Sequence, residues 1–193
     1  MRKIRYEDLL DNPEYIAGRD QFRRDIIAYK KIRRVQLGEL VSVLFENRRT
    51  LWYQTQEMLR AEHIEDPRLR REEMDVYNDM LADGLTLAAT LLIEIPDSSQ
   101  IPAVLQRMTG CEEHVTLWID DQPYPAEAEP GRSREDKTSS IHYLTVPLGP
   151  KGLQALTDAE RVELRLDHPT YQAAARLGAD TVASLLADLT EPE

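Results

Sequence analysis

Two carboxylate–histidine pairs are the residues of this chain best suited to chemistry. Glu62 directly precedes His63, and Glu113 directly precedes His114. Carboxylate oxygens and imidazole nitrogens suit zinc, iron and manganese, and they also form proton-transfer pairs. The same residue types often make only surface hydrogen bonds at helix ends and sheet rims. The pattern therefore leaves a metal site and an ordinary surface role both open.

Further polar residues lie in segments that alternate with the two-residue period of a β-strand. Glu94, His114 and His142 each occupy a position from which they could share one sheet face, if their strands are neighbours. Glu62 lies near the centre of the apolar stripe of its predicted helix, where a lone charge needs a partner. The candidate ligands for a divalent metal are therefore Glu62, Glu94, Glu113, His114 and His142.

Several other chemistries lack the residues they need. The eight glycines do not cluster, so the sequence contains no phosphate-binding loop or dinucleotide fingerprint. A single cysteine, Cys111, excludes an intramolecular disulfide and a cysteine-based cluster held by this chain alone. Two glutamates follow Cys111, and their charge raises a thiol pKa and weakens its nucleophilicity. A small, partly buried cysteine is the favoured interpretation.

The net charge of −11 is unevenly distributed. Residues 1–38 contain ten Lys and Arg against six Asp and Glu, a net of +4, so the remainder carries −15. The basic residues alternate with apolar ones at helical spacing, which favours a basic helix docked on an acidic body. Binding of nucleic acid is the least favoured alternative, because an acidic body repels a phosphate backbone.

The sequence predicts one α+β domain over residues 1–193, with a largely antiparallel sheet of about five to six strands. Residues 1–38 form a long helical segment, with a helix from Pro13 to Gln36. Residues 39–84 form a strand and a helical hairpin, which pack with the N-terminal helix on one face of the sheet. Residues 85–193 form antiparallel strands with short helices, and residues 121–139 form a mobile loop rich in Pro, Glu, Gly and Ser.

The predicted strands cover residues 40–46, 85–95, 114–120, 140–148, 161–167 and 171–177. The N-terminus lacks the apolar region of a signal peptide, and the longest apolar run, residues 84–93, is too short to span a bilayer. We therefore expect a cytoplasmic protein without a membrane segment.

Residues 45–62, Phe-Glu-Asn-Arg-Arg-Thr-Leu-Trp-Tyr-Gln-Thr-Gln-Glu-Met-Leu-Arg-Ala-Glu, resemble the signature segment of the DUF3501 family. Residues 5–10, 89–95 and 112–115 are similar to the family as well, so the resemblance spans nearly the whole chain. The family is one of unknown function, so no catalytic residue is transferred. Its members tend to occur beside rubrerythrin-like and heterodisulfide-reductase-like iron–sulfur proteins, and the resemblance thus implies a redox or oxidative-stress context.

The family segment and the basic helix also supply candidates for docking a partner. In the segment, Gln56 and Arg60 are four residues apart and Glu57 and Arg60 three apart, which is typical of local bracing along a helix. A docking face is the alternative. The docking candidates are Arg48, Gln56, Glu57 and Arg60 in the segment, and Lys30, Lys31, Arg33 and Arg34 in the basic helix.

The favoured function is a non-catalytic accessory or binding protein that acts beside an iron–sulfur or di-iron protein. A homodimer is compatible with this interpretation. The alternative is a small metal-dependent enzyme or metal-binding protein that uses the carboxylate and histidine ligands named above.

Overall fold

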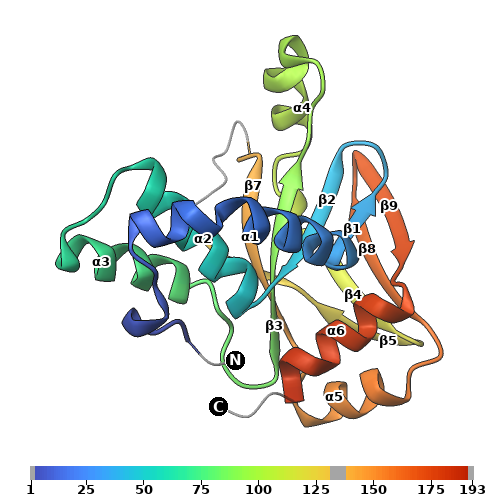
Figure 1. Cartoon of the computed structure of the whole chain (residues 1–193). Helices are drawn as coiled ribbons and strands as arrows, with labels where there is room; N and C mark the ends of the chain where they lie inside the picture. The colour runs from blue at the N-terminus through green and yellow to red at the C-terminus, as the bar shows by residue number, and fades with distance from the viewer. Residues whose placement is uncertain (1–2, 131–137, 191–193) are drawn as a thin grey trace.

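The computed structural model of the protein describes residues 3–130 and 138–190. Their strands form two antiparallel sheets that pack face to face (Figure 1). The first sheet has the order β1-β2-β3-β7-β6, with β1 Arg34–Leu37, β2 Val41–Glu46, β3 Thr86–Ile93, β7 Ile141–Pro147 and β6 Glu127–Ala128. The second has the order β5-β4-β8-β9, with β5 Gln122–Pro125, β4 Val115–Ile119, β8 Val162–His168 and β9 Tyr171–Arg176.

The main hydrophobic core lies between the two sheets. Along β4 and β8, every second side chain is buried, as the alternation of apolar and polar residues requires. These side chains meet the inward residues of the first sheet, among them Val43, Phe45 and Leu91. Strand β2 is buried at all its positions, because helices cover the outer face of the first sheet while the second sheet covers its inner face.

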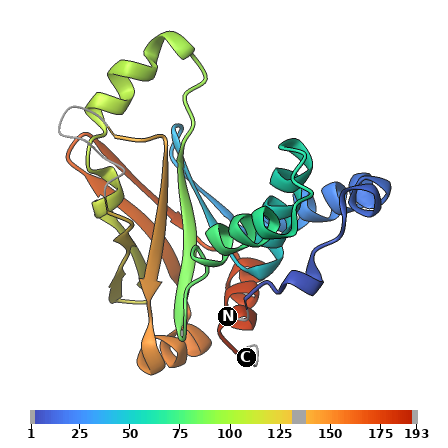
Figure 2. The same ribbon diagram turned by 90° about the vertical axis from the view of Figure 1, so that its left-hand side faces the viewer.

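Three helices form a layer on the outer face of the first sheet, opposite the second sheet (Figure 2). They are α1 Asn12–Arg33, α2 Arg48–Ala61 and α3 Pro67–Asn78. Each begins at a side chain that accepts backbone N–H groups, namely Asp11, Asn47 and Asp66. A second hydrophobic cluster, which includes Leu51 and Met74, lies under the hairpin of α2 and α3.

The remaining helices lie around the ends of the sandwich. Helix α4 extends at one end, while α5 and α6 pack against each other at the opposite end (Figure 1). Their bounds are α4 Ile101–Arg107, α5 Gly149–Asp158 and α6 Ala179–Thr190. Short 3₁₀ helices cover η1 Tyr6–Asp8, η2 Ser98–Gln100 and η3 Cys111–His114. Among the described residues, no helix has both the length and the apolar character needed to cross a membrane.

The two sheets are connected at both edges. On one edge, the chain passes from β5 in the second sheet to β6 in the first through buried Ala126, whose N–H donates to the carbonyl of Val115. On the other edge, the Tyr171 hydroxyl of β9 donates to the Leu37 carbonyl and accepts from the Leu40 N–H, at 2.6 and 3.0 Å. These contacts join β9 to the β1–β2 hairpin and close the sandwich.

The predicted α+β class with antiparallel strands, a long N-terminal helix and a helical hairpin is confirmed. The strands are divided between two sheets. Helix α1 ends at Arg33 rather than Gln36, because residues 34–37 alternate between exposed and buried positions and pair with β2. The predicted loop at residues 121–139 contains β5 and β6, and its residues 131–137 lie outside the described part of the chain.

Candidate functional site

The candidate ligands Glu94 and His142 lie on opposite faces of the first sheet. His142 is paired with Leu91, and both side chains point into the core between the sheets. Glu94 follows β3 on the outer side, where it accepts hydrogen bonds from Ser42 at 2.7 Å and Arg34 at 3.3 Å. The expectation that Glu94 and His142 share one face is therefore wrong. The two-residue alternation within each strand does not determine the register between strands, so it does not show which residue of one strand lies opposite which residue of the next.

His142 belongs to a buried polar cluster at one end of the core. Its Nε2 lies 2.7 Å from Thr138 Oγ1 and 2.9 Å from the Ser139 carbonyl oxygen. Its Nδ1 is 3.6 Å from Glu112 Oε1, too far for a hydrogen bond. Glu112, rather than the predicted Glu113, is therefore the acidic residue next to this imidazole. Among the described residues, the cluster is an acid–base pair with a hydroxyl, which is fewer ligands than a metal site needs.

The other predicted ligands are separated from this cluster. Glu62 is the exposed C-cap of α2 and not a residue of its apolar stripe, because the helix ends at Ala61. Glu113 and His114 are exposed in η3, and the His114 ring packs edge-to-face on His168 with centroids 5.2 Å apart. Within residues 3–130 and 138–190, no three His, Cys, Asp or Glu side chains are placed to hold a metal ion.

Cys111 is fully buried beside this region. Burial raises the pKa of its thiol to about 12, and the charge of Glu112 adds to the effect. The thiolate is the reactive form of cysteine, so this residue is held in its unreactive form at neutral pH.

The docking candidates in α2 mainly connect this helix to the N-terminal segment. Gln56 is fully buried and bonds to both the N–H and the carbonyl of Leu10, at 3.2 and 3.3 Å. Arg48 forms an ion pair with Asp8 at 2.6 Å. Arg60 donates to Glu57 at 3.4 Å. Of these contacts, the one between Arg60 and Glu57 is the bracing predicted from the spacing. Gln56 bonds to Leu10 rather than to Arg60, and its burial leaves it no surface for a partner.

Glu57 is the centre of the contact between α1 and α2. Arg19 donates two hydrogen bonds to its carboxylate, both 2.7 Å long, and the Tyr15 hydroxyl donates one of 2.8 Å. The hydrogen bonding from Arg19 lowers the pKa of Glu57 to about 2; burial opposes the change, while Tyr15 and Arg60 add to it. Glu57 is thus held as a carboxylate by two residues of α1 and by Arg60 of its own helix.

The prediction that Arg33 docks a partner is wrong, because its side chain is completely buried. It pairs with Asp188 of α6 at 2.5 Å and donates to the Ser184 hydroxyl at 2.6 Å and the Phe45 carbonyl at 2.8 Å. Asn47 donates to the second oxygen of Asp188 at 2.7 Å. Arg33 therefore joins α1, α6 and the end of β2, and it has no surface on which to receive a partner.

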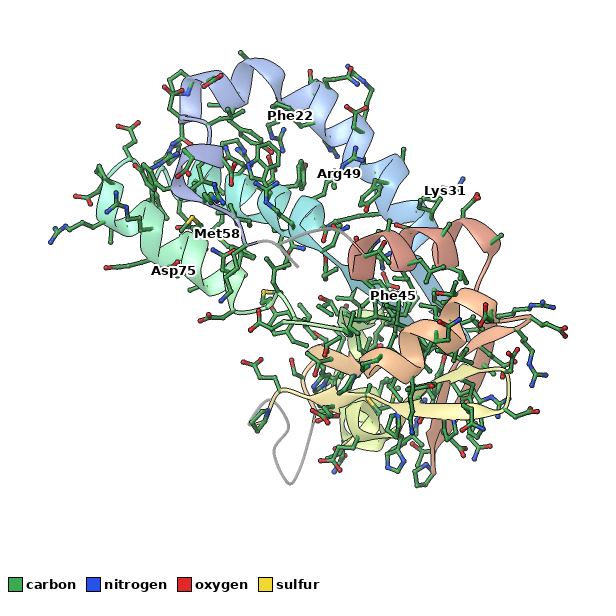
Figure 3. The ribbon with its side chains drawn as sticks, turned by 90° about the horizontal axis from the view of Figure 1, so that it is seen from below. Phe22, Lys31, Phe45, Arg49, Met58 and Asp75 are labelled. Atoms are coloured by element: carbon green, nitrogen blue, oxygen red, sulfur yellow. The ribbon has the colours of Figure 1, made fainter. Side chains whose placement is uncertain are left out.

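The other basic candidates differ in how much they face solvent. Burial lowers the pKa of Lys30, which is half-buried. Arg34 forms its ion pair with Glu94 at 3.3 Å. Lys31 is exposed on α1 and makes no ion pair with another described residue (Figure 3).

A mixed apolar and basic surface follows the outer side of α1. Ile16 and Ile27 are 57% and 59% exposed. They are eleven residues apart, so they lie on one side of the helix. Arg23, Arg24 and Lys31 are exposed on the same side of the helix, and so is one acidic residue, Asp20. We name Ile16, Arg23, Arg24, Ile27 and Lys31 the α1 surface. Helical spacing predicts that α1 is basic, but it does not predict the exposure of the two isoleucines.

The sequence matches the family described as "Protein of unknown function (DUF3501)" over residues 3–189. The chain belongs to the DUF3501 family. This DUF3501 chain is also similar to a solved structure from Burkholderia pseudomallei K96243, described as a novel protein of unknown function at 1.90 Å resolution. The two share 36% identity with a TM-score of 0.90, over 97% of this chain and 100% of the other. Among curated proteins, none matches the sequence significantly.

The match places the α1 surface and the bracing of α2 inside the family region of this DUF3501 chain. Neither the family description nor that of the solved structure assigns an activity.

Proposed function

We propose that this DUF3501 protein is a non-catalytic accessory protein that docks an acidic face of a redox protein on the α1 surface. The observation that carries the proposal is the exposure of Ile16 and Ile27 among three cationic side chains and a single carboxylate, that of Asp20. Exposed apolar groups next to arginines are typical of protein interfaces, since they combine burial with directed hydrogen bonds. A partner that covers this surface removes both isoleucines from water.

Charge determines what kind of partner fits. The α1 surface presents Arg23, Arg24 and Lys31 on a protein whose overall charge is −11. A negatively charged partner would be attracted to α1 and repelled by the rest of the molecule, so its orientation would be selected during encounter. Of the residues predicted to dock a partner, the α1 surface contains Lys31, which is exposed. It does not contain Arg33 or Gln56, because both are buried.

The redox part of the proposal rests on the context that the resemblance to the DUF3501 family implies, namely action beside iron–sulfur or di-iron proteins. An accessory protein needs no catalytic group of its own. The buried thiol of Cys111 and the internal position of His142 agree with this role.

The test is affinity capture of the tagged full-length protein from its own host, with measurement of iron in the captured fraction. We expect the wild type to retain an iron-containing protein at low salt and to lose it as salt rises. Arg23→Glu and Ile27→Ser should each abolish capture. Lys151→Glu makes the same charge change as Arg23→Glu on exposed α5, away from the α1 surface, and should leave capture unchanged.

Three results would contradict the proposal. The first is a captured fraction that contains no iron, and the second is an Arg23→Glu variant that captures as much protein as the wild type. The third is a homodimer in sedimentation that Ile27→Ser converts to a monomer, since a second copy would then occupy the α1 surface.

A further inference from the structure

A groove of about 470 Å³ lies between the C-terminal part of α3 and the edge of the first sheet formed by β6 and β7. Tyr77 and Met80 line it from the α3 side, and Tyr143 and Thr145 from β7. Strand β6 is held beside β7 by ladder pairing and by the Glu129 N–H, which donates to the Tyr143 carbonyl at 2.9 Å. The groove is of the size that holds small ligands. It is formed by elements other than α1.

The groove has only negative charge on the described residues that line it. Asp79, Glu127 and Glu129 contribute carboxylates, and the lining contains no Lys, Arg or His within the described ranges. Asp79 and Glu127 form no ion pair with another described residue. The charges of the described lining residues would repel an anionic ligand, whereas a cation would find opposite charge at Asp79 on the α3 side and at Glu127 on the β6 side.

Aromatic and thioether groups accompany the carboxylates. Tyr77 and Tyr143 are both half-buried and line the groove from its two sides. The pKa of Tyr77 is raised by burial first, then by Glu73 and Tyr143. Aromatic faces attract organic cations, and a methionine thioether packs well against methylene groups. A hydrated metal ion could not use these apolar contacts. The lining therefore suits a cation with an apolar stem.

We propose that the groove is a binding site for a small organic cation of the polyamine type. Its ammonium groups pair with Asp79 and Glu127, and its methylene chain packs on Tyr77 and Tyr143. This site takes a ligand of charge opposite to the partner proposed for the α1 surface, and it does not depend on that partner.

The test is calorimetric titration of the full-length protein with spermidine at near-physiological salt. We expect saturable binding at one site. Tyr77→Leu and Glu127→Gln should each weaken it by about threefold to fivefold, since the first removes an aromatic face and the second an exposed charge. Tyr77→Phe keeps the aromatic face and should bind like the wild type, which also shows that the position tolerates substitution.

Two controls separate the groove from general attraction to an acidic protein. Glu160→Gln removes one charge from the exposed acidic surface near Asp120, Asp121 and Asp158, and should not change spermidine affinity. Octane-1,8-diol has a methylene chain but no ammonium group and should not bind. The proposal is overturned if spermidine does not bind, if Glu160→Gln weakens binding as much as Glu127→Gln, or if the diol binds equally well.

Discussion

Glu57 accepts hydrogen bonds from Arg19, Tyr15 and Arg60, and its charge is part of the contact between α1 and α2. Its pKa of about 2 in the folded protein lies below the value near 4.5 of a free glutamate. The unfolded chain therefore binds a proton more readily than the folded one as the pH falls. The stability that Glu57 supplies is complete above about pH 4.5 and is lost as the pH approaches 2.

We predict that Glu57→Gln lowers the free energy of unfolding by about 1–2 kcal/mol at pH 6, because the charge-assisted hydrogen bonds are weakened. The difference from wild type should shrink at pH 3. Urea unfolding at both pH values measures it. Asp25→Asn is the control, because Asp25 is an exposed residue of α1, and this change should have no comparable effect. A difference that is equal at both pH values would show that Glu57 acts by packing rather than by charge.

Arg33 is the residue whose loss we expect to be most damaging. Arg33→Met should lower the free energy of unfolding by about 3–5 kcal/mol, because Asp188 would keep a buried charge without its ion-pair partner. The double variant Arg33→Met with Asp188→Leu should lose less free energy of unfolding than the two single variants lose when their losses are added. Denaturant unfolding of the three variants measures this coupling. Additive losses would show that the two side chains stabilise the fold independently.

At the scale of elements, the β1–β2 hairpin shows how one glycine allows two sheets to meet. Gly38 has a φ of +68°, and a Cβ there would lie 2.4 Å from the Tyr171 hydroxyl. That hydroxyl already bonds to Leu37 and Leu40. The position thus combines a left-handed backbone with a close approach of β9.

We predict that Gly38→Ala lowers the free energy of unfolding by about 2–3 kcal/mol, from backbone strain and displacement of Tyr171. Gly84→Ala is the matched control, because Gly84 has a φ of +60° but open space around its Cβ position. It should lose only the backbone part, about 1 kcal/mol. Thermal or urea unfolding compares them. Equal losses would mean that Tyr171 moves without cost.

Elements with a strong local signal could be predicted from the sequence. Asp11, Asn47 and Asp66 cap the three helices, and the spacing of Tyr15, Phe22, Ile26 and Tyr29 marks the inner side of α1 (Figure 3 labels Phe22). The short strands β1, β5 and β6 could not be predicted, because strands of two to four residues lack enough alternation to compete with a helix end or a loop.

At the scale of the whole molecule, the uneven charge becomes a spatial arrangement. The basic α1 lies on the outside of the helical layer (Figure 2). The acidic groove lies between α3 and the edge of the first sheet formed by β6 and β7. Opposite charges are thereby presented by different elements. The two proposed sites can therefore be altered one at a time, by Arg23→Glu on one and Glu127→Gln on the other.

The sequence by itself determined the α+β class, the helix starts, most strands and the charge of the first 38 residues, because capping, periodicity and charge act over a few neighbouring residues. Only the tertiary structure decided that Glu94 and His142 lie on opposite faces, that Arg33 is buried against Asp188, and that Tyr77 and Tyr143 share a groove. Those outcomes depend on strand register and on contacts between residues up to 155 positions apart, which no local pattern encodes.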